Sequence, residues 1–316
     1  MCGLCGLAGT GIQTKDLEAF SDLLWVTSLR GHHSTGVFSY APSKVKKYNL
    51  QKELGPSPLF ILRDEAKKIP DSQLDSVLTE LLMGHCRYAT KGHVTRDNAH
   101  PFDTGRYVSA HNGTLVDSKY DHKSKTDSQL LFEDIERRGI EKVIKGLDYN
   151  SAYALSIFDK QTETLTLGTN GDRPLYGAYN TERSVLYWAS ELSALQFIAT
   201  RRKLKVNFIE FEDDKFYSVS IKDISKSGRF WDIVEYPKKA PPPSKKWDWD
   251  KMGWSDAKKL EAFCCCCGTL LYGKAKHEAY SIEFDGEMYW TCADCIGPAS
   301  PDCIDPLAGM KESDKF

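Results

Sequence analysis

The sequence contains no run of 18 apolar residues, and it does not open with a basic stretch followed by an apolar one. We therefore expect neither a membrane-spanning helix nor a secretory leader, and we expect a cytoplasmic location. Opposite charges nearly cancel, since 42 Lys and Arg stand against 44 Asp and Glu, so no overall field attracts nucleic acid. The length of 316 residues and the hydrophobic fraction of 41% allow one large domain with a smaller one.

Cysteine is scarce over most of the chain, because only Cys2, Cys5 and Cys86 precede residue 264. The initiator methionine is normally removed when the next side chain is small. Its removal would place a thiol and a free α-amine on Cys2, which could then supply both nucleophile and base. Their unperturbed pKa values, about 8.5 and about 7.7–8.0, favour proton exchange between them. Alone, Cys2 is weak evidence, since a small apolar residue opening a strand explains it equally well.

A dense series of polar motifs lies between residues 84 and 128. The series reads Gly84-His85-Cys86-Arg87-Tyr88-Ala89-Thr90, Asn98-Ala99-His100-Pro101-Phe102, His111-Asn112-Gly113 and Thr126-Asp127-Ser128. Read alone, an Asn-Gly pair after the strand-like residues 107–110 predicts a hairpin turn. The order of the motifs behind an N-terminal cysteine favours another interpretation, in which they form one site.

In this set and order the motifs resemble those of the class II glutamine amidotransferases, which are N-terminal-nucleophile hydrolases. The resemblance covers residues 2–235 and extends to Arg30-Gly31 with Ser34 and Gly36, Arg173-Pro174-Leu175-Tyr176-Gly177 and Ala189-Ser190-Glu191-Leu192. It implies an α+β fold, a four-layer αββα sandwich. It also implies an enzyme that hydrolyses glutamine to glutamate and ammonia through a γ-glutamyl thioester on Cys2, without a cofactor for that reaction.

The resemblance also assigns roles to the motif residues. The assigned residues are Cys2, Asn112 and Gly113 for catalysis and Arg87, Thr90, His100 and Asp127 for substrate binding. A guanidinium binds a carboxylate through two parallel hydrogen bonds, so Arg87 suits the α-carboxylate of glutamine, and Asp127 suits the α-ammonium. The Asn112 amide and the Gly113 N–H are the fixed donors that a developing oxyanion needs.

Three positions depart from the pattern of many relatives. Cys86 replaces a threonine, Lys91 replaces a histidine, and His33 replaces an aspartate. These differences bear on how the carboxylate end of the substrate is held, and less on the hydrolytic residues. Adjacent side chains rarely converge on one ion, so we interpret His32 and His33 as a packed or hydrogen-bonded loop near the nucleophile.

Apolar periodicity predicts the secondary structure of the large domain. Helical spacing occurs at residues 17–24, at Leu74, Leu78 and Leu81, over 128–147 with a break at Gly139, and at 192–198. Hairpins are expected over 151–168 and 174–189, and two more strands at 206–211 and 216–221, with Asp213 and Asp214 at the turn between them. The large domain then ends at a stiff Pro- and Lys-rich linker, residues 236–247.

Residues 248–316 form a small module in which cysteine is abundant. We expect a structural Zn²⁺ held by Cys264, Cys267, Cys292 and Cys295, because two C-x-x-C pairs are a strong zinc signal. Strands at 280–284 and 287–291 would complete a zinc ribbon, and a module this small needs such a staple. Cys265 or Cys266 could replace a ligand in the run of four, while Cys303 and His277 are weaker candidates. The alternatives are disulfides, which a reducing cytosol disfavours, or palmitoylated cysteines.

Three functions remain open. The chain could be an amidotransferase subunit that passes ammonia to a synthase on another chain, since residues 236–316 are too few for a synthase domain. It could be a stand-alone hydrolase of glutamine or γ-glutamyl compounds, which would need no partner. A non-catalytic adaptor that binds nucleic acid through the zinc module is disfavoured, because an adaptor needs none of the site residues.

Overall fold

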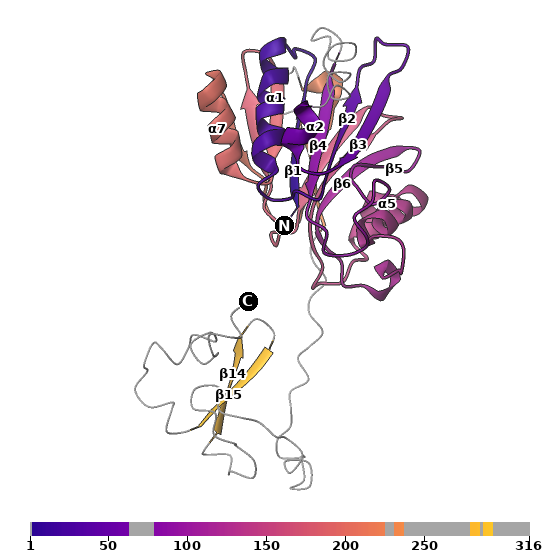
Figure 1. The fold of residues 1–316 in the computed structure, drawn as a ribbon, viewed down its shortest axis with the longest axis vertical. Coiled ribbons are helices and arrows are strands. Elements are labelled where there is room, and N and C mark those ends of the chain that lie inside the picture. Colours follow the sequence, from indigo (N-terminus) through magenta and orange to yellow (C-terminus); the bar gives the residue numbers. More distant parts are fainter. Residues whose placement is uncertain (1, 63–78, 225–230, 237–278, 285–286, 293–316) are drawn as a thin grey trace. The chain divides into compact units, whose positions relative to one another are not determined.

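The structure is a computed structural model that describes residues 2–62, 79–224, 231–236, 279–284 and 287–292. The chain divides into two compact units, Met1–Pro241 and Pro242–Phe316. The first unit is an α+β structure with antiparallel sheets, as the sequence predicted (Figure 1). None of the helices that the structure describes has the length and apolar character needed to cross a membrane.

The larger sheet has the N-terminal strand near its centre. Its strand order is β11-β9-β10-β1-β4-β2-β3, and all of its pairs are antiparallel. The strands are Gly3–Ala8 (β1), Ser34–Tyr40 (β2), Tyr48–Leu54 (β3), Leu81–Arg87 (β4), Tyr176–Asn180 (β9), Val185–Ala189 (β10) and Asn207–Glu210 (β11). Every residue of β1, β2 and β4 is buried, so both faces of these strands are covered.

The second sheet has the order β13-β12-β8-β7-β6-β5, again with antiparallel pairs throughout. Its strands are Phe102–Asp103 (β5), Tyr107–Thr114 (β6), Ala152–Asp159 (β7), Thr164–Thr169 (β8), Lys215–Ser220 (β12) and Asp232–Glu235 (β13). Asn112 and Gly113 lie inside β6, where they pair with Ala154 and Tyr153 of β7. The hairpin turn that the Asn-Gly pair suggests when read alone is therefore not formed.

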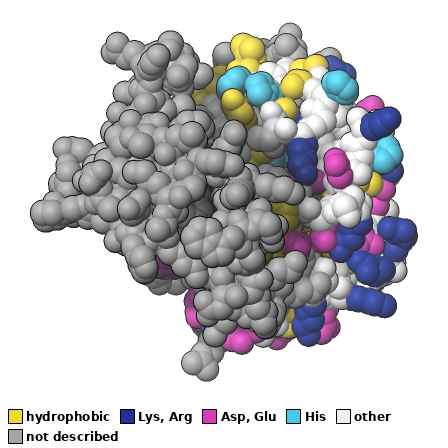
Figure 2. Space-filling model, turned by 90° about the horizontal axis from the view of Figure 1, so that it is seen from below, with side chains coloured by type: hydrophobic (Ala, Val, Ile, Leu, Met, Phe, Trp, Pro, Cys, Tyr) yellow, Lys and Arg dark blue, Asp and Glu magenta, His cyan; other side chains and the backbone are white. Residues whose placement is uncertain are grey.

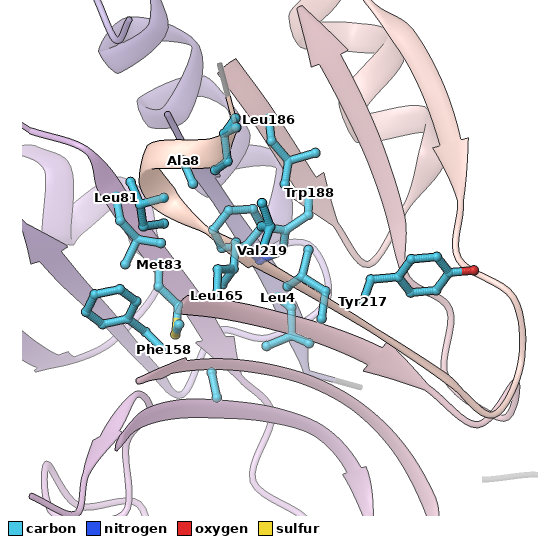
Figure 3. Close-up of a cluster of buried hydrophobic side chains, with 14 of the residues drawn as sticks. Leu4, Ala8, Leu81, Met83, Phe158, Leu165, Leu186, Trp188, Tyr217 and Val219 are labelled. Atoms are coloured by element: carbon cyan, nitrogen blue, oxygen red, sulfur yellow. The ribbon is translucent and has the colours of Figure 1, made fainter. Parts of the chain in front are cut away.

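The main hydrophobic cluster draws side chains from both sheets. Leu4, Met83 and Trp188 come from the larger sheet, and Phe158 and Leu165 come from the second one (Figure 3). In the close-up the Tyr217 hydroxyl points away from the other labelled side chains, and it accepts a hydrogen bond from the Glu212 N–H at 3.2 Å. The sheets are thus joined through apolar contacts.

Two further clusters join the helices to the sheets. The helices are Thr14–Thr27 (α1), Ser57–Leu62 (α2), Asp127–Arg138 (α5), Ile140–Ile144 (α6) and Leu192–Arg202 (α7), with short 3-10 turns at Ser118–Tyr120 and Ile221–Asp223. One cluster packs α1, α2 and α7 with strands of the larger sheet. The other packs α5 and α6 with strands of the second sheet. Figure 1 shows α1 and α7 next to each other, and α5 beside β5 and β6.

Most of the elements expected in the large domain are found. The helices near residues 17–24 and 192–198 are α1 and α7, and the break at Gly139 separates α5 from α6. Both hairpins and both later strands are also present, but β11 pairs with β9 while β12 pairs with β8. The chain therefore crosses between the sheets at residues 211–214, where Asp214 has a positive φ of 57°.

One helix assignment is wrong at its end. Leu81 opens β4 and pairs with Ala8 of β1, although its spacing from Leu74 and Leu78 suggested a helix. Those two residues lie outside the described part of the chain. Burial on both faces makes β4 almost continuously apolar, and such a run cannot be told from a buried helical segment by periodicity.

The second unit is described only as a hairpin. Strands β14, Ala279–Phe284, and β15, Glu287–Cys292, pair antiparallel, as expected from the sequence. Cys292 ends β15 opposite Ala279, at the open end of the hairpin. Cys264, Cys267 and Cys295 lie outside the described residues, so the zinc site stays a prediction.

Helix α1 is attached to the larger sheet by a buried carboxylate. The Asp16 side chain is fully buried and accepts the Gln13 N–H at 2.8 Å, which caps the helix. Its other oxygen accepts from Arg183 Nη2 at 2.7 Å and from the Tyr187 hydroxyl of β10. One side chain therefore caps the helix and binds it to the strand beside β1.

We expect Asp16→Ala to destabilise the first unit by about 3 kcal/mol, because it removes one partner of a buried ion pair and leaves Arg183 uncompensated. Urea dependence of hydrogen exchange at β1 and β10 amides measures this loss. Glu18→Ala is the matched control on the same helix: Glu18 pairs with Arg202 at the surface, and such pairs contribute roughly 0–1 kcal/mol. Equal effects of the two changes would contradict the structural role of Asp16.

Candidate functional site

A pocket lies where β1 begins and β4 ends. Because Gly3 pairs with Cys86, Cys2 and Arg87 lie next to each other where these two inner strands of the larger sheet begin and end. The pocket has about 280 Å³ of empty space and is open to solvent. Its lining residues are Cys2, Arg87, Tyr88, Thr90, Lys91, His100, His111, Gly113, Thr126, Asp127 and Ser128. Segments separated by up to 126 positions in the sequence thus meet at one pocket.

Of the seven site residues predicted from the sequence, all but Asn112 line this pocket. The other five lining residues were not assigned roles, although Tyr88, His111, Thr126 and Ser128 stand in the quoted motifs. Only Lys91 had been noted as a departure from the family pattern. Their position in the sequence could have identified them, since each of the five is next to a residue that was assigned a role.

The Cys2 thiol is held by the backbone of one residue. Its Sγ accepts the Tyr88 N–H at 3.3 Å and donates to the Tyr88 carbonyl at 3.4 Å. Arg30 Nε donates to the Cys2 carbonyl at 2.8 Å, and Arg30 also pairs with Glu191. Burial raises the pKa of the Cys2 thiol, while the Tyr88 backbone bond and the Arg87 charge act against this rise.

Arg87 connects the pocket to the loop that follows β4. Its Nη1 donates to the His93 carbonyl at 3.0 Å and its Nη2 to the Lys91 carbonyl at 2.5 Å. A guanidinium has five N–H groups, so others remain for a substrate carboxylate. The Lys91 ammonium donates to the Leu115 carbonyl at 2.9 Å, which links this loop to the residues after β6. Two cationic side chains therefore border the pocket.

Asp127 is fixed at the first turn of α5. Its Oδ2 accepts the Leu115 N–H at 2.9 Å and its Oδ1 accepts the Ser128 N–H at 2.8 Å. Thr126 precedes it as the N-cap, accepting from the Gln129 N–H at 3.1 Å. The carboxylate is buried and lines the pocket, and its position at the helix N-terminus favours negative charge. It is the one acidic side chain of the lining.

Asn112 and Gly113 reach the site from β6. Asn112 Nδ2 lies 3.5 Å from Ser190 Oγ, which also accepts the Leu4 N–H at 2.9 Å. A Cβ at position 113 would lie 1.9 Å from the Ala152 carbonyl oxygen, so only glycine allows β7 to approach this closely. The Asn112 amide is thus linked through Ser190 to β1, the strand that follows Cys2, and Gly113 lines the pocket.

Three buried histidines form a group at the pocket, where His100 and His111 line it and His85 lies next to them. His85 and His100 stack with ring centroids 4.1 Å apart, and His85 Nε2 donates to the His111 carbonyl at 3.1 Å. His111 Nδ1 is 2.8 Å from Ser128 Oγ. Burial lowers the pKa of His85 to about 3 and lowers the pKa of His100 and His111 as well. All three are therefore neutral near pH 7 and contribute polarity without charge.

Within the described ranges, no group of three or more His, Cys, Asp or Glu side chains is placed to hold a metal ion. His32 and His33 lie beside Tyr88, with His33 and Tyr88 stacked at 4.8 Å between centroids. Figure 2 shows histidine side chains among hydrophobic ones on one part of the surface, with Lys and Arg side chains gathered elsewhere.

Comparison with protein families gives an independent result. Residues 61–212 match the family model of the glutamine amidotransferase domain. A glutamine–fructose-6-phosphate aminotransferase (isomerizing) of Streptococcus pyogenes serotype M3 is 29% identical over 197 residues, which are 56% of this chain and 30% of that enzyme. The enzyme of the same name from Leifsonia xyli subsp. xyli is 31% identical over 160 residues, 49% of this chain and 24% of the enzyme. The chain thus spans less than a third of these curated relatives.

Solved structures agree in fold. An allosteric regulatory enzyme of purine biosynthesis matches with a TM-score of 0.55 and 19% identity, over 75% of this chain and 50% of the other. Glutamine phosphoribosylpyrophosphate amidotransferase from B. subtilis gives a TM-score of 0.54 at the same identity and coverage. At this identity the likeness concerns the fold alone. Residues 61–212 thus match a glutamine amidotransferase domain, and the curated relatives and the fold agree with the resemblance to class II glutamine amidotransferases.

Proposed function

We propose that this protein hydrolyses glutamine to glutamate and ammonia at Cys2 and delivers the ammonia to a synthase partner. The observation that carries the proposal is the single pocket that joins the Cys2 thiol to Arg87 and Asp127. Free glutamine has one carboxylate, one ammonium and one amide, and the pocket offers a complementary group for each. Measuring glutamate and ammonia release by the purified chain tests the proposal directly.

The proposed reaction begins with transfer of the Cys2 thiol proton to the free α-amine of the same residue. The thiolate attacks the amide carbon, and Asn112 and Gly113 donate to the resulting oxyanion. Collapse of this intermediate expels ammonia, which takes up the proton held by the amine, and leaves a γ-glutamyl thioester. Water then hydrolyses the thioester, which releases glutamate and restores the thiol.

In the proposed binding mode, Arg87 takes the α-carboxylate and Asp127 the α-ammonium, with Thr90 and His100 beside them. The Arg87 guanidinium is already oriented by two carbonyls of the loop at 91–93. The Asp127 carboxylate is oriented by two backbone N–H groups. Both groups are held before substrate arrives, which lowers the entropy cost of binding.

We propose a synthase on another chain as the acceptor of the ammonia, in the cytoplasm. The two aminotransferases named above are more than three times as long as their match to this chain. A stand-alone hydrolase remains the second candidate, and it predicts full turnover without a partner. Purifying the protein with its native partners, and comparing turnover with and without them, separates the two candidates.

We also propose a division of the chain into a glutaminase domain at 2–235, folded as a four-layer αββα sandwich, a linker at 236–247 and a zinc module at 248–316. The clusters that join α1, α2 and α7 to one sheet and α5 and α6 to the other support the sandwich. The β14–β15 hairpin, with Cys292 at its open end, suits a ribbon in which Cys295 lies three residues further on. A Zn²⁺ there would have a structural role.

The nucleophile gives the first test of this proposal. We expect Cys2→Ala to abolish glutamine hydrolysis while the fold is kept, since the small side chain suits a strand start. A variant with extra residues fixed before Cys2 should be equally inactive, because its amine is then an amide and cannot act as base. Glutamate release and circular dichroism measure the two effects. An active preparation whose intact mass retains Met1 would rule out the mechanism.

Variants that impair substrate binding and variants that impair oxyanion stabilisation should differ in their effects on KM and kcat. Asn112→Ala should lower kcat by about 10²-fold or more if the amide donates to the oxyanion. Arg87→Lys should mainly raise KM for glutamine, because lysine keeps the charge but loses the planar pair of donors. Steady-state kinetics over a range of glutamine concentrations distinguish these outcomes. Unchanged kcat in Asn112→Ala would refute its assigned role.

The zinc module should be separable from glutamine hydrolysis. We expect one Zn²⁺ per chain, and its binding should supply on the order of 10 kcal/mol to folding of the module. Chelation or Cys292→Ser should therefore remove hydrogen-exchange protection from β14 and β15, while hydrolysis at Cys2 continues. Cys303→Ser, a weaker ligand candidate, is the control. Metal analysis of protein purified under reducing conditions decides the stoichiometry, and a metal-free chain with protected strands would exclude the zinc proposal.

A further inference from the structure

We infer that His33 is a positioning residue for the nucleophile, and that it acts through the segment Arg87–Ala89. This inference rests on the proposed glutamine hydrolysis at Cys2. His33 stands in the loop between α1 and β2, outside the set of residues that line the pocket. It contacts the segment that enters the pocket, in which Arg87 and Tyr88 are lining residues and Tyr88 bonds the Cys2 Sγ.

His33 contacts three consecutive residues of that segment. Its backbone N–H donates to the Arg87 carbonyl at 3.0 Å. Its ring stacks on Tyr88, with centroids 4.8 Å apart and an interplanar angle of 29°. Its Nδ1 accepts the Ala89 N–H at 2.9 Å. His33 therefore fixes the position and the direction of the Tyr88 backbone, whose N–H and carbonyl both bond the Cys2 thiol.

The close approach of the two segments depends on the residue before the histidines. A Cβ on Gly31 would lie 2.5 Å from both the Arg87 carbonyl carbon and the Cys86 oxygen. Glycine therefore allows the loop to lie directly against the end of β4. On its other side the His33 carbonyl accepts the Gly55 N–H at 3.0 Å, just beyond β3. The histidine is thus anchored from its own side as well.

The Nδ1 bond sets a requirement on the protonation state of His33. An imidazole nitrogen accepts a hydrogen bond only when it carries no proton, and both nitrogens of an imidazolium are donors. Protonated His33 therefore cannot hold the Ala89 N–H. The groups around it that bear on its charge are the His32 ring, the Tyr88 ring and the Arg87 guanidinium. Burial, His32 and Arg87 all lower the pKa of His33, so they favour the neutral form that accepts.

The sign of the pH dependence follows from that direction. Because the pKa of His33 is lowered by folding, its contact with Ala89 is intact above the unperturbed value and is lost as pH falls through the lowered value. Loss of the contact frees Tyr88 and Ala89, and with them the backbone groups that bond Sγ. The rate should therefore fall at acid pH for a second reason, beyond protonation of the α-amine that serves as base.

Three variants separate the parts of this role. His33→Asn offers an acceptor oxygen close to the position of Nδ1 but cannot titrate. His33→Phe keeps a ring for stacking but has no acceptor. His32→Phe is the matched control: His32 also lies edge-on to His33 and Tyr88, so it tests whether any change in this aromatic group has the same effect. Each variant is measured in the full-length protein.

The first readout is the pH profile of glutamine hydrolysis. As pH falls through the pKa of His33, log kcat/KM of the wild type should drop about one unit further than that of His33→Asn, while the fall caused by protonation of the α-amine, with a slope of about one, is common to both. His33→Phe should lose about tenfold or more in kcat/KM at every pH, as expected for an unsatisfied backbone donor. His32→Phe should keep the wild-type profile. Wild-type rates in His33→Phe, or an equal loss in His32→Phe, would overturn the inference.

The second readout does not depend on turnover. Hydrogen exchange at the Ala89 amide should be protected in the wild type and in His33→Asn at neutral pH, and unprotected in His33→Phe. Wild-type protection should vanish at acid pH, while that of His33→Asn should persist. Absence of glutamine hydrolysis in the wild type would refute the proposed function alone. Ala89 protection that ignores His33 would refute the positioning role, whatever the activity.

Discussion

The pairing of β1 on both edges is the constraint on which the site depends. An N-terminal nucleophile must sit at a chain end, and chain ends are usually poorly ordered unless they are tied down. Here β1 pairs with β4 on one side and β10 on the other, and all six of its residues are buried. The residue before the strand inherits this rigidity, so the Cys2 thiol has a fixed position although it lies at the second residue of the sequence.

The loop after β4 converts that fixed position into a site. Arg87 is the last residue of β4 and pairs with Ser34. Its guanidinium donates hydrogen bonds to the carbonyls of Lys91 and His93, which hold the loop after β4 beside Arg87. Tyr88, between the two, presents both its N–H and its carbonyl to the Cys2 thiol. Substrate grip and nucleophile placement thus share one short segment, and a change in either is expected to disturb the other.

The sequence predicted the helices, hairpins and most lining residues, because these follow from periodicity and from contiguous motifs. It failed where the outcome depends on partners far along the chain. Leu81 is part of β4 because β1 and β2 pair with that strand on either side. Strand β11 pairs with β9 and not with β12, the next strand along the chain. Local patterns contain no information on such pairing. The sequence placed His33 in a loop near the nucleophile, but its contact with Ala89 was not foreseen, since that contact spans 56 residues.

The charges around the pocket oppose the effect of burial on the Cys2 thiol without cancelling it, since its pKa stays raised. Burial is the largest cause that raises the pKa of Cys2, and the three buried histidines at the pocket are neutral, so they do not lower it. Arg87 and Lys91 oppose only Asp127 among the charged lining residues. The excess positive charge favours a thiolate electrostatically. A substrate carboxylate at Arg87 would reduce this excess, so the ammonium of glutamine and the α-amine of Cys2 are needed to keep the thiolate stable during attack.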